Sequence, residues 1–258
     1  MEQEFTQRQK QIKQQFIDDR GKWKWNDLWQ TILLLDEEII QAYSTFSSVP
    51  IKKGHLDLKT QKYIYIAIDA ISGSLYLPGL KSHTKHALES GVTPKEIMEV
   101  LEITSTLGST TFARGIPLLV EILQNRGERI SDIELTDSRK KLKDDYIKNH
   151  QGYWSDEMEN ILKLDPEYFE AFTAYEDTPW KIGVLKPKVK ELIYIAVHAV
   201  MVTLNEPELK CHIGKAMDYG ATREDIIAVF EMVSCLGVHS ITAGVPILKE
   251  AMAEVGQK

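Results

Sequence analysis

The sequence repeats itself with an offset of 129 residues, and this duplication constrains the fold more than any other feature. Residues 64–121 and 193–250 align without a gap and share 23 identical residues in 58. The clearest shared stretches are YIAIDA (65–70) with YIAVHA (194–199), LKSH (80–83) with LKCH (209–212), and GIPLL (115–119) with GVPIL (244–248). A gap-free match of this length indicates a duplicated structural unit. We therefore predict two repeats, 1–129 and 130–258, joined around 129–149 and packed face to face as a pseudo-dimer.

Hydrophobic periodicity in each repeat is typical of α-helices. Apolar residues recur at positions 64, 67, 68 and 71, and again at 193, 196, 197 and 200. This spacing places them along one helix face. The helix that follows is expected to end at Gly91 in the first repeat and Gly220 in the second, each in a left-handed conformation.

Further helix signals come after these glycines. Thr93 and Thr222 each precede an acidic residue by three positions, as in a capping box, and so predict the start of another helix. Pro117 and Pro246 should either begin or kink the last helix of each repeat. Because no alternating strand pattern of useful length occurs, the predicted fold class is all-α.

Composition excludes several functional classes. The net charge of −7 and the pI near 5.6 argue against nucleic acid or an anionic membrane as the main partner. The polar N-terminal stretch MEQEFTQRQKQIKQQF lacks the apolar centre of a signal peptide. The only cysteines, Cys211 and Cys235, cannot form a disulfide framework, so we expect a cytoplasmic protein with reduced thiols.

The repeats retain one histidine each, His83 and His212, on the apolar face of a predicted helix. An inward histidine is often a core residue that makes one hydrogen bond. Its presence in both repeats favours a functional role as much as a structural one. The neighbouring Cys211 corresponds to Ser82, so the repeated unit does not require a thiol there.

These residues resemble the carboxymuconolactone decarboxylase and alkylhydroperoxidase D-like superfamily. The resemblance rests on ELIYIAVHAV (191–200) and ELKCHIGKAMDYGATREDIIAVFEMV (208–233), and on the matching histidine, alanine, glycine and threonine at 83–93. It implies helical repeats of the alkylhydroperoxidase D-like type and a homo-oligomer such as a trimer of pseudo-dimers. It also implies a small carboxylate or lactone as substrate, with no metal and no cofactor.

The peroxidase branch of that superfamily uses a Cys-x-x-Cys before the histidine. The two cysteine positions hold Tyr76 and Gly79 in the first repeat, and Asn205 and Glu208 in the second. Without a resolving thiol, a dithiol–disulfide cycle cannot operate. A peroxiredoxin-like antioxidant function is therefore the weaker alternative, and Cys211 is expected to be inert.

The decarboxylase branch carries Glu-Leu-x-x-His, which ELKCH (208–212) fits. The resemblance then implies roles for the second repeat: His212 as general acid/base, Glu191 as its orienting partner, and Glu208 as a second proton carrier. Surface ion pairing for Glu191 and a favourable helix-terminal charge for Glu208 are the structural alternatives.

The first repeat retains His83 but has Lys62 and Gly79 where the second has its two glutamates. His83 is kept as a candidate catalytic residue, and the second repeat is predicted to carry the chemistry. His83 and His86 lie three residues apart without further ligands nearby, so no metal site is expected. A cofactor-free lyase or isomerase is the leading prediction, and a non-catalytic small-molecule binding protein remains open.

Overall fold

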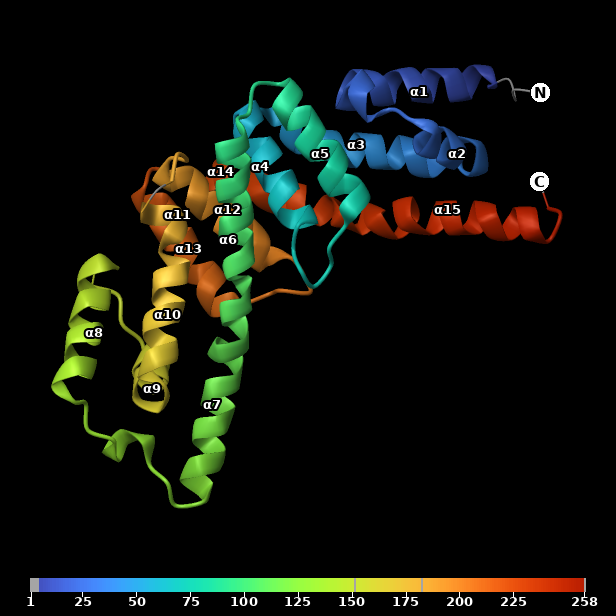
Figure 1. The fold of residues 1–258 in the computed structure, drawn as a ribbon. Coiled ribbons are helices and arrows are strands. Elements are labelled where there is room, and N and C mark those ends of the chain that lie inside the picture. The colour runs from blue at the N-terminus through green and yellow to red at the C-terminus, as the bar shows by residue number, and fades with distance from the viewer. Residues whose placement is uncertain (1–4, 151, 182, 258) are drawn as a thin grey trace. The chain divides into compact units, whose positions relative to one another are not determined.

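The structure is a computed structural model that describes residues 5–150, 152–181 and 183–257. Within these ranges the chain is helical and forms no β-strand, which confirms the all-α prediction (Figure 1). The α-helices are α1 (Gln7–Arg20), α2 (Asp27–Leu35), α3 (Glu37–Lys53), α4 (Leu58–Asp69), α5 (Leu77–Glu89), α6 (Pro94–Ser105), α7 (Thr110–Asn125), α8 (Asp137–Asn149), α9 (Asp156–Leu164), α10 (Pro166–Glu176), α11 (Thr178–Lys181), α12 (Pro187–Ala199), α13 (Glu206–Asp218), α14 (Arg223–Ser234) and α15 (His239–Glu254). Short 3-10 turns are η1 (Lys22–Lys24), η2 (Thr106–Ser109), η3 (Ile130–Asp132) and η4 (Cys235–Val238).

The helices of the two repeats correspond in pairs at the offset of 129. The pairs are α1 with α8, α2 with α9, α3 with α10 and α11, α4 with α12, α5 with α13, α6 with α14, and α7 with α15. The expected joint at 129–149 is corrected by this correspondence, because most of it is α8, the first helix of the second repeat. The tandem helical repeats are thus present.

The compact units of the structure are not the sequence repeats. One unit contains Met1–Leu101 together with Leu185–Lys258, and the other contains Glu102–Val184. Each unit therefore combines helices from both repeats.

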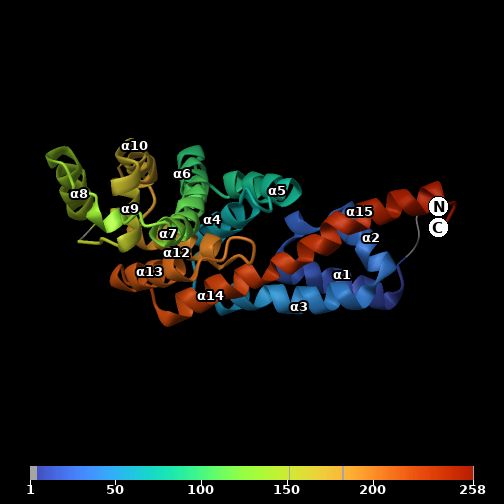
Figure 2. The ribbon, with the colours of Figure 1, turned by 90° about the horizontal axis from the view of Figure 1, so that it is seen from below.

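In the first unit, the last helix of the second repeat packs on the first helices of the first repeat. The core cluster there is formed by Ile12, Phe16, Trp29, Ile32, Leu33 and Ile40. Val238, Ile241 and Val245, from η4 and α15, pack against it. Figure 2 shows α15 running beside α2, with which it is in contact. Burial of these large side chains is the main stabilising contribution at this contact.

The second unit contains the reciprocal arrangement. Its core cluster consists of Ile116, Tyr146, Ile161, Leu162 and Phe169. Here α7, the last helix of the first repeat, packs against α9 of the second. The repeats have therefore exchanged their last helices, so neither repeat holds its own complete set of contacts.

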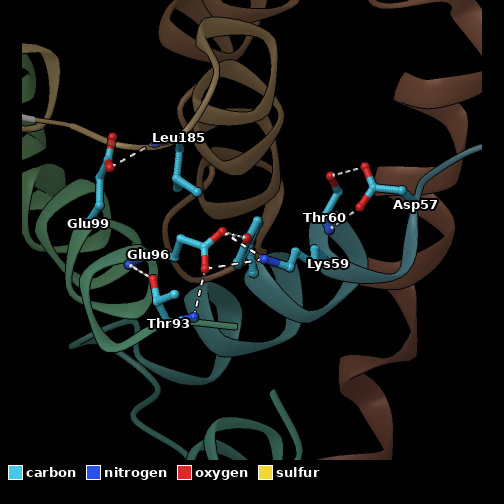
Figure 3. A network of polar contacts seen from close by, with 8 residues as sticks. Asp57, Lys59, Thr60, Thr93, Glu96, Glu99 and Leu185 are labelled. Carbon is cyan, nitrogen blue, oxygen red and sulfur yellow. Dashed lines mark hydrogen bonds and ion pairs between the residues drawn. The ribbon is translucent and has the colours of Figure 1, made fainter. Parts of the chain in front are cut away.

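The predicted helix boundaries have the expected caps. Thr93 and Glu96 bond each other's backbone N–H at the start of α6 (Figure 3), and Thr222 forms a capping box with Asp225. Asp57 caps α4 through the Thr60 N–H at 2.9 Å. These side chains satisfy donors that the first helical turn leaves free.

The predicted glycine and proline positions have different outcomes. Gly91 and Gly220 adopt φ values of 82° and 83°, as left-handed helix ends require. Pro117 and Pro246 lie inside α7 and α15, so neither proline begins its helix.

A buried ion pair joins α6 to α12. Lys190 Nζ lies 2.8 Å from Glu99 Oε1, and their side chains are 5% and 3% exposed. The other Glu99 oxygen accepts the Leu185 N–H at 3.0 Å (Figure 3). Both charges are withdrawn from water, and the pairing offsets part of the cost of burying each of them.

The described residues contain one helical run, Arg223–Glu254, that is long and apolar enough to cross a membrane by length and composition alone. It comprises α14, η4 and α15. Core helices of globular proteins pass the same test, and α14 buries Ile226, Val229 and Met232. The run is therefore weak support for a membrane span.

Candidate functional site

Both repeated histidines are buried, as their helix faces predict. His83 in α5 and His212 in α13 are each 8% exposed. Their rings lie near equivalent tyrosines: Tyr65 has its centroid 4.9 Å from that of His83, and Tyr194 stacks on His212 at 4.4 Å. The duplication has thus preserved a Tyr–His pair in each repeat.

In the second repeat, the predicted partners meet. His212 Nδ1 lies 2.6 Å from Glu191 Oε2, and Glu191 is 1% exposed. Burial raises the pKa of Glu191 to about 7, with Lys215 opposing the shift. Burial, reinforced by Lys215, lowers the pKa of His212 to about 3. The low-polarity surroundings therefore favour the neutral forms of both groups.

The remaining groups near His212 are less closely engaged. Glu208 Oε2 lies 3.8 Å from His212 Nε2, which is beyond hydrogen-bond distance. The His198 ring centroid lies 5.3 Å from that of His212, and burial lowers the pKa of His198 to about 3. His198 Nδ1 is buried and has no hydrogen-bond partner among the described residues.

Replacing Glu191 with glutamine should change how stability depends on pH. Between about pH 4.5 and 7, the folded chain holds a proton on Glu191 that the unfolded chain has released. The resulting stabilisation is present below the unfolded pKa and is lost as pH rises through the folded pKa. As pH rises through this range, the free energy of unfolding of the wild type should therefore fall by at most about 3 kcal/mol relative to that of Glu191→Gln. Urea unfolding at a series of pH values measures the difference.

The exposed Glu206, also in the Glu191–His212 half of the chain, provides the matched control Glu206→Gln. Its unfolding curves should follow the wild type across the same pH series. Parallel wild-type and Glu191→Gln stability profiles would contradict the buried, proton-holding state of Glu191.

In the first repeat, the structure corrects the expectation that His83 has lost its acid. His83 Nδ1 lies 2.8 Å from Asp69 Oδ2. Asp69 is equivalent to His198 and lies seven residues, about two helical turns, beyond the Lys62 position that corresponds to Glu191. The two repeats therefore orient equivalent histidines with carboxylates from different turns of equivalent helices, α4 and α12.

The position of Asp69 leaves no room for a side chain at residue 79, which is glycine. A Cβ atom built on Gly79 would lie 2.5 Å from Asp69 Oδ2 and 2.6 Å from Tyr76 Cδ1. The glutamate found at the equivalent position 208 could not occupy this space without displacing Asp69. Loss of the Glu-Leu-x-x-His glutamate thus accompanies the gain of Asp69.

Gly79→Ala is expected to lower the free energy of unfolding by about 1–3 kcal/mol, because Asp69 is held by hydrogen bonds and cannot yield freely. The control is Gly214→Ala in α13, where a Cβ would meet nothing within 4 Å. That substitution should stabilise the helix by about 0.5–1 kcal/mol. Thermal and urea unfolding measure both, and equal effects would contradict the proposed close approach.

The Asp69–His83 pair extends in two directions. Lys24 Nζ lies 2.8 Å from His83 Nε2, on the opposite side of the ring from Asp69. His239, the first residue of α15, places Nε2 3.3 Å from Asp69 Oδ1. His239 also stacks on Tyr76 at 3.9 Å. The exchanged helix of the second repeat therefore completes the histidine site of the first.

A cavity of about 90 Å³ lies against this cluster. Its polar lining includes Arg20, Lys24, Asp69, His83 and His239, and its apolar lining includes Leu28, Trp29, Ile68, Met232 and Val238. A cavity with a few convergent polar groups on an apolar wall is typical of a small-molecule site.

The cavity contains more positive than negative charge. Arg20 is 7% exposed and bonds the Ser47 carbonyl at 2.7 Å. Within the described parts of the chain, no carboxylate oxygen lies within 4.0 Å of a nitrogen of Arg20 or of Lys24 Nζ. Asp69 is the acid in the lining and is shared by two histidines, so an anionic ligand would offset uncompensated charge.

The protonation states follow from these surroundings. Burial, and then the charge of Arg20, lowers the pKa of Lys24 to about 7. Burial and the neighbouring Lys24 charge lower the pKa of His83 to about 4. Burial opposes ionisation of Asp69, but hydrogen bonds from His239 and His83 outweigh it, so the pKa of Asp69 lies below its usual value. At neutral pH, Lys24 is the group poised to exchange a proton.

Sequence reasoning did not identify Asp69, Lys24 or His239. Lys24 lies in the tryptophan-rich stretch KWKWNDLW (22–29) and corresponds to Tyr153, and His239 corresponds to Thr110, so neither residue is retained in both repeats. The available signal was the simultaneous difference at 62, 69 and 79, where the first repeat lacks the two glutamates of the second and has an aspartate in place of His198.

Neither cysteine has the properties of a reactive thiolate. Burial raises the pKa of Cys211 and likewise that of Cys235, whereas a nucleophilic cysteine needs a lowered pKa. In the described ranges, no cluster of three metal-ligating side chains occurs. His86 instead stacks on Trp23 at 3.9 Å.

Comparisons with known proteins identify the family of the chain. The sequence profile of the carboxymuconolactone decarboxylase family matches residues 37–115 and 166–253, one segment in each repeat. A crystal structure from Burkholderia xenovorans LB400, of a protein assigned as a gamma-carboxymuconolactone decarboxylase subunit, is similar with a TM-score of 0.88 and 38% sequence identity. The similarity covers 96% of this chain and 98% of that chain. No curated protein matches the sequence.

Proposed function

This chain belongs to the carboxymuconolactone decarboxylase family, and on that basis we propose that it is a cofactor-free lyase or isomerase of a small carboxylate or lactone. The observation that carries the proposal is the Lys24–His83–Asp69 chain beside a cavity with uncompensated positive charge. The first-repeat histidine, completed by α15, is the proposed catalytic centre.

The substrate carboxylate would be attracted by Arg20 and Lys24. For a lactone acid, loss of CO2 leaves an electron pair that the conjugated lactone carbonyl can hold, and a proton must then reach carbon. Lys24 and His83 share one transferable proton through the Nζ–H···Nε2 bond. Asp69 stabilises the imidazolium whenever that proton lies on His83. One proton is consumed per CO2 released, and solvent recharges Lys24.

The proposed assay measures CO2 release and ultraviolet absorbance with gamma-carboxymuconolactone, the substrate class suggested by the name of the Burkholderia protein. Activity should fall above about pH 7, because Lys24 then loses the proton it donates. Binding without turnover of any lactone acid tested would favour the non-catalytic binding protein. Thiol-dependent peroxide consumption lost in Cys211→Ser would favour the antioxidant alternative.

The Glu191–His212 pair is a second candidate acid/base pair, with Glu208 nearby. A carboxyl that titrates near neutral pH suits general acid catalysis. The two centres are distinguished by matched histidine variants, described in the Discussion.

A homo-oligomer, such as a trimer of pseudo-dimers, is also proposed. Large apolar side chains are exposed at equivalent positions of both repeats: Leu75 and Leu204, Leu88 and Met217, Leu118 and Ile247, and Leu119 and Leu248. Exposed apolar patches mark interaction surfaces. Light scattering coupled to size-exclusion chromatography should give a multiple of the 29.5 kDa chain mass, and a stable monomer at micromolar concentration would contradict this. A cytoplasmic location is proposed from the two cysteines, which cannot form a disulfide framework. The acidic net charge supports the absence of nucleic-acid and membrane partners.

A further inference from the structure

Lys24 occupies an unusual environment for a lysine. It is the last residue of η1, which follows α1 after Gly21 turns the chain with φ 89°. It is partly buried and lines the cavity, while Lys22, two residues earlier in the same turn, is exposed. One short turn thus holds a solvated lysine and an enclosed one.

The Lys24 amine has no neutralising acid beside it. Within the described ranges, no carboxylate oxygen lies within 4.0 Å of Nζ, and Asp69 is engaged on the far side of the His83 ring. Arg20 lines the same cavity and adds a second positive charge. Desolvation and a cationic neighbour are the two conditions that convert a lysine into a nucleophilic amine at neutral pH. The pKa of about 7 agrees with this geometry.

A base is already in contact with the amine. His83 Nε2 lies 2.8 Å from Nζ, and its Nδ1 faces Asp69. His83 can therefore accept a proton from Lys24 and return it later, because Asp69 stabilises the imidazolium formed in between. Attack of an amine on a carbonyl, followed by loss of water, needs such a proton carrier.

Arg20 provides an anchor for a carboxylate. Arg20 is buried, with 7% of its surface exposed. Its Nε has no hydrogen-bond partner among the described residues. Arginine binds carboxylates through paired N–H groups. Arg20 and Lys24 line one cavity, so a single short molecule can engage both.

We propose that Lys24 forms a Schiff base with a small oxo acid whose carboxylate is held by Arg20. The neutral Lys24 amine bonds to the carbonyl carbon. One amine proton and one proton from solvent reach the carbonyl oxygen through His83, so the oxygen leaves as water and the nitrogen is left as an iminium. With a 3-oxo acid, the iminium accepts the electron pair released when CO2 departs. Protonation of the enamine carbon and hydrolysis then return the ketone and the free amine.

This inference shares the cavity with the proposed function but uses Lys24 as a nucleophile instead of an acid. The full-length protein is incubated with acetoacetate and sodium borohydride at pH 7.5, and its mass and peptides are measured. One reduced adduct per chain should appear on Lys24. Its yield should exceed that of any exposed lysine by on the order of a hundredfold, because a pKa near 7 leaves most of the amine neutral.

Methyl acetoacetate is the matched probe, since it has the same ketone without the carboxylate. Its trapping at Lys24 should be at least tenfold weaker, and that difference should disappear in Arg20→Gln. Lys24→Arg, which keeps the charge, should lose the adduct, while Lys22→Arg should retain it. Peptide mapping of the wild type decides the site even where a variant fails to fold.

An absence of adduct, or adducts spread evenly over surface lysines, overturns the Schiff base. The two roles of Lys24 have opposite pH dependence: trapping should rise through pH 7, whereas proton donation should fall. Lactone turnover without trapping would therefore leave the proposed function standing, and trapping without lactone turnover would overturn only that function.

Discussion

His83→Gln is expected to reduce turnover of a lactone acid by about 10²- to 10⁴-fold, the range typical of a lost acid/base group. Glutamine keeps a polar side chain of similar reach in α5 but cannot relay a proton between Lys24 and Asp69. Steady-state kinetics of CO2 release measures the effect, and circular dichroism confirms folding. The fall should appear in kcat, because the relay acts on the chemical step.

The matched control is His212→Gln, which removes the equivalent residue of the second repeat. Turnover should then stay within about threefold of the wild type, since the cavity and its cations adjoin His83. The opposite pattern, with His212→Gln inactive and His83→Gln active, would contradict the assignment of His83 as the catalytic centre. It would place the chemistry at the Glu191–His212 pair.

Glu99→Ala is expected to lower the free energy of unfolding by about 3–5 kcal/mol, the cost of leaving one buried charge without its partner. Lys190 is 4% exposed and cannot turn to water without disrupting α12, and the Leu185 N–H also loses its acceptor. Urea unfolding followed by tryptophan fluorescence measures the loss.

The double variant Glu99→Met/Lys190→Met tests the cause. Replacing both charges with apolar side chains removes the uncompensated charge and should recover most of the lost stability. As a control, the exposed pair Arg223–Glu224 should contribute less than about 1 kcal/mol. A double variant as unstable as Glu99→Ala would show that packing, not charge, sets the cost.

The sequence alone determined the features that depend on local pattern. The 129-residue duplication, the all-α class, the capping threonines Thr93 and Thr222, and the burial of both histidines all follow from periodicity and spacing. The pairing of Glu191 with His212 was also within reach, because the family resemblance covers both residues. Each of these features is set by local spacing, by the duplication or by the family resemblance.

Only the tertiary structure decided which residues complete the first site. Asp69 lies on α4 two turns beyond Lys62, the position that corresponds to Glu191, and it reaches His83 because Gly79 leaves room. Lys24 comes from a turn 59 residues before His83, and His239 comes from the other repeat. Exchange of the last helices brings His239 to this site, and periodicity along the chain carries no signal of it. The duplication predicts two equivalent sites, whereas three-dimensional packing surrounds His83 and His212 with different side chains.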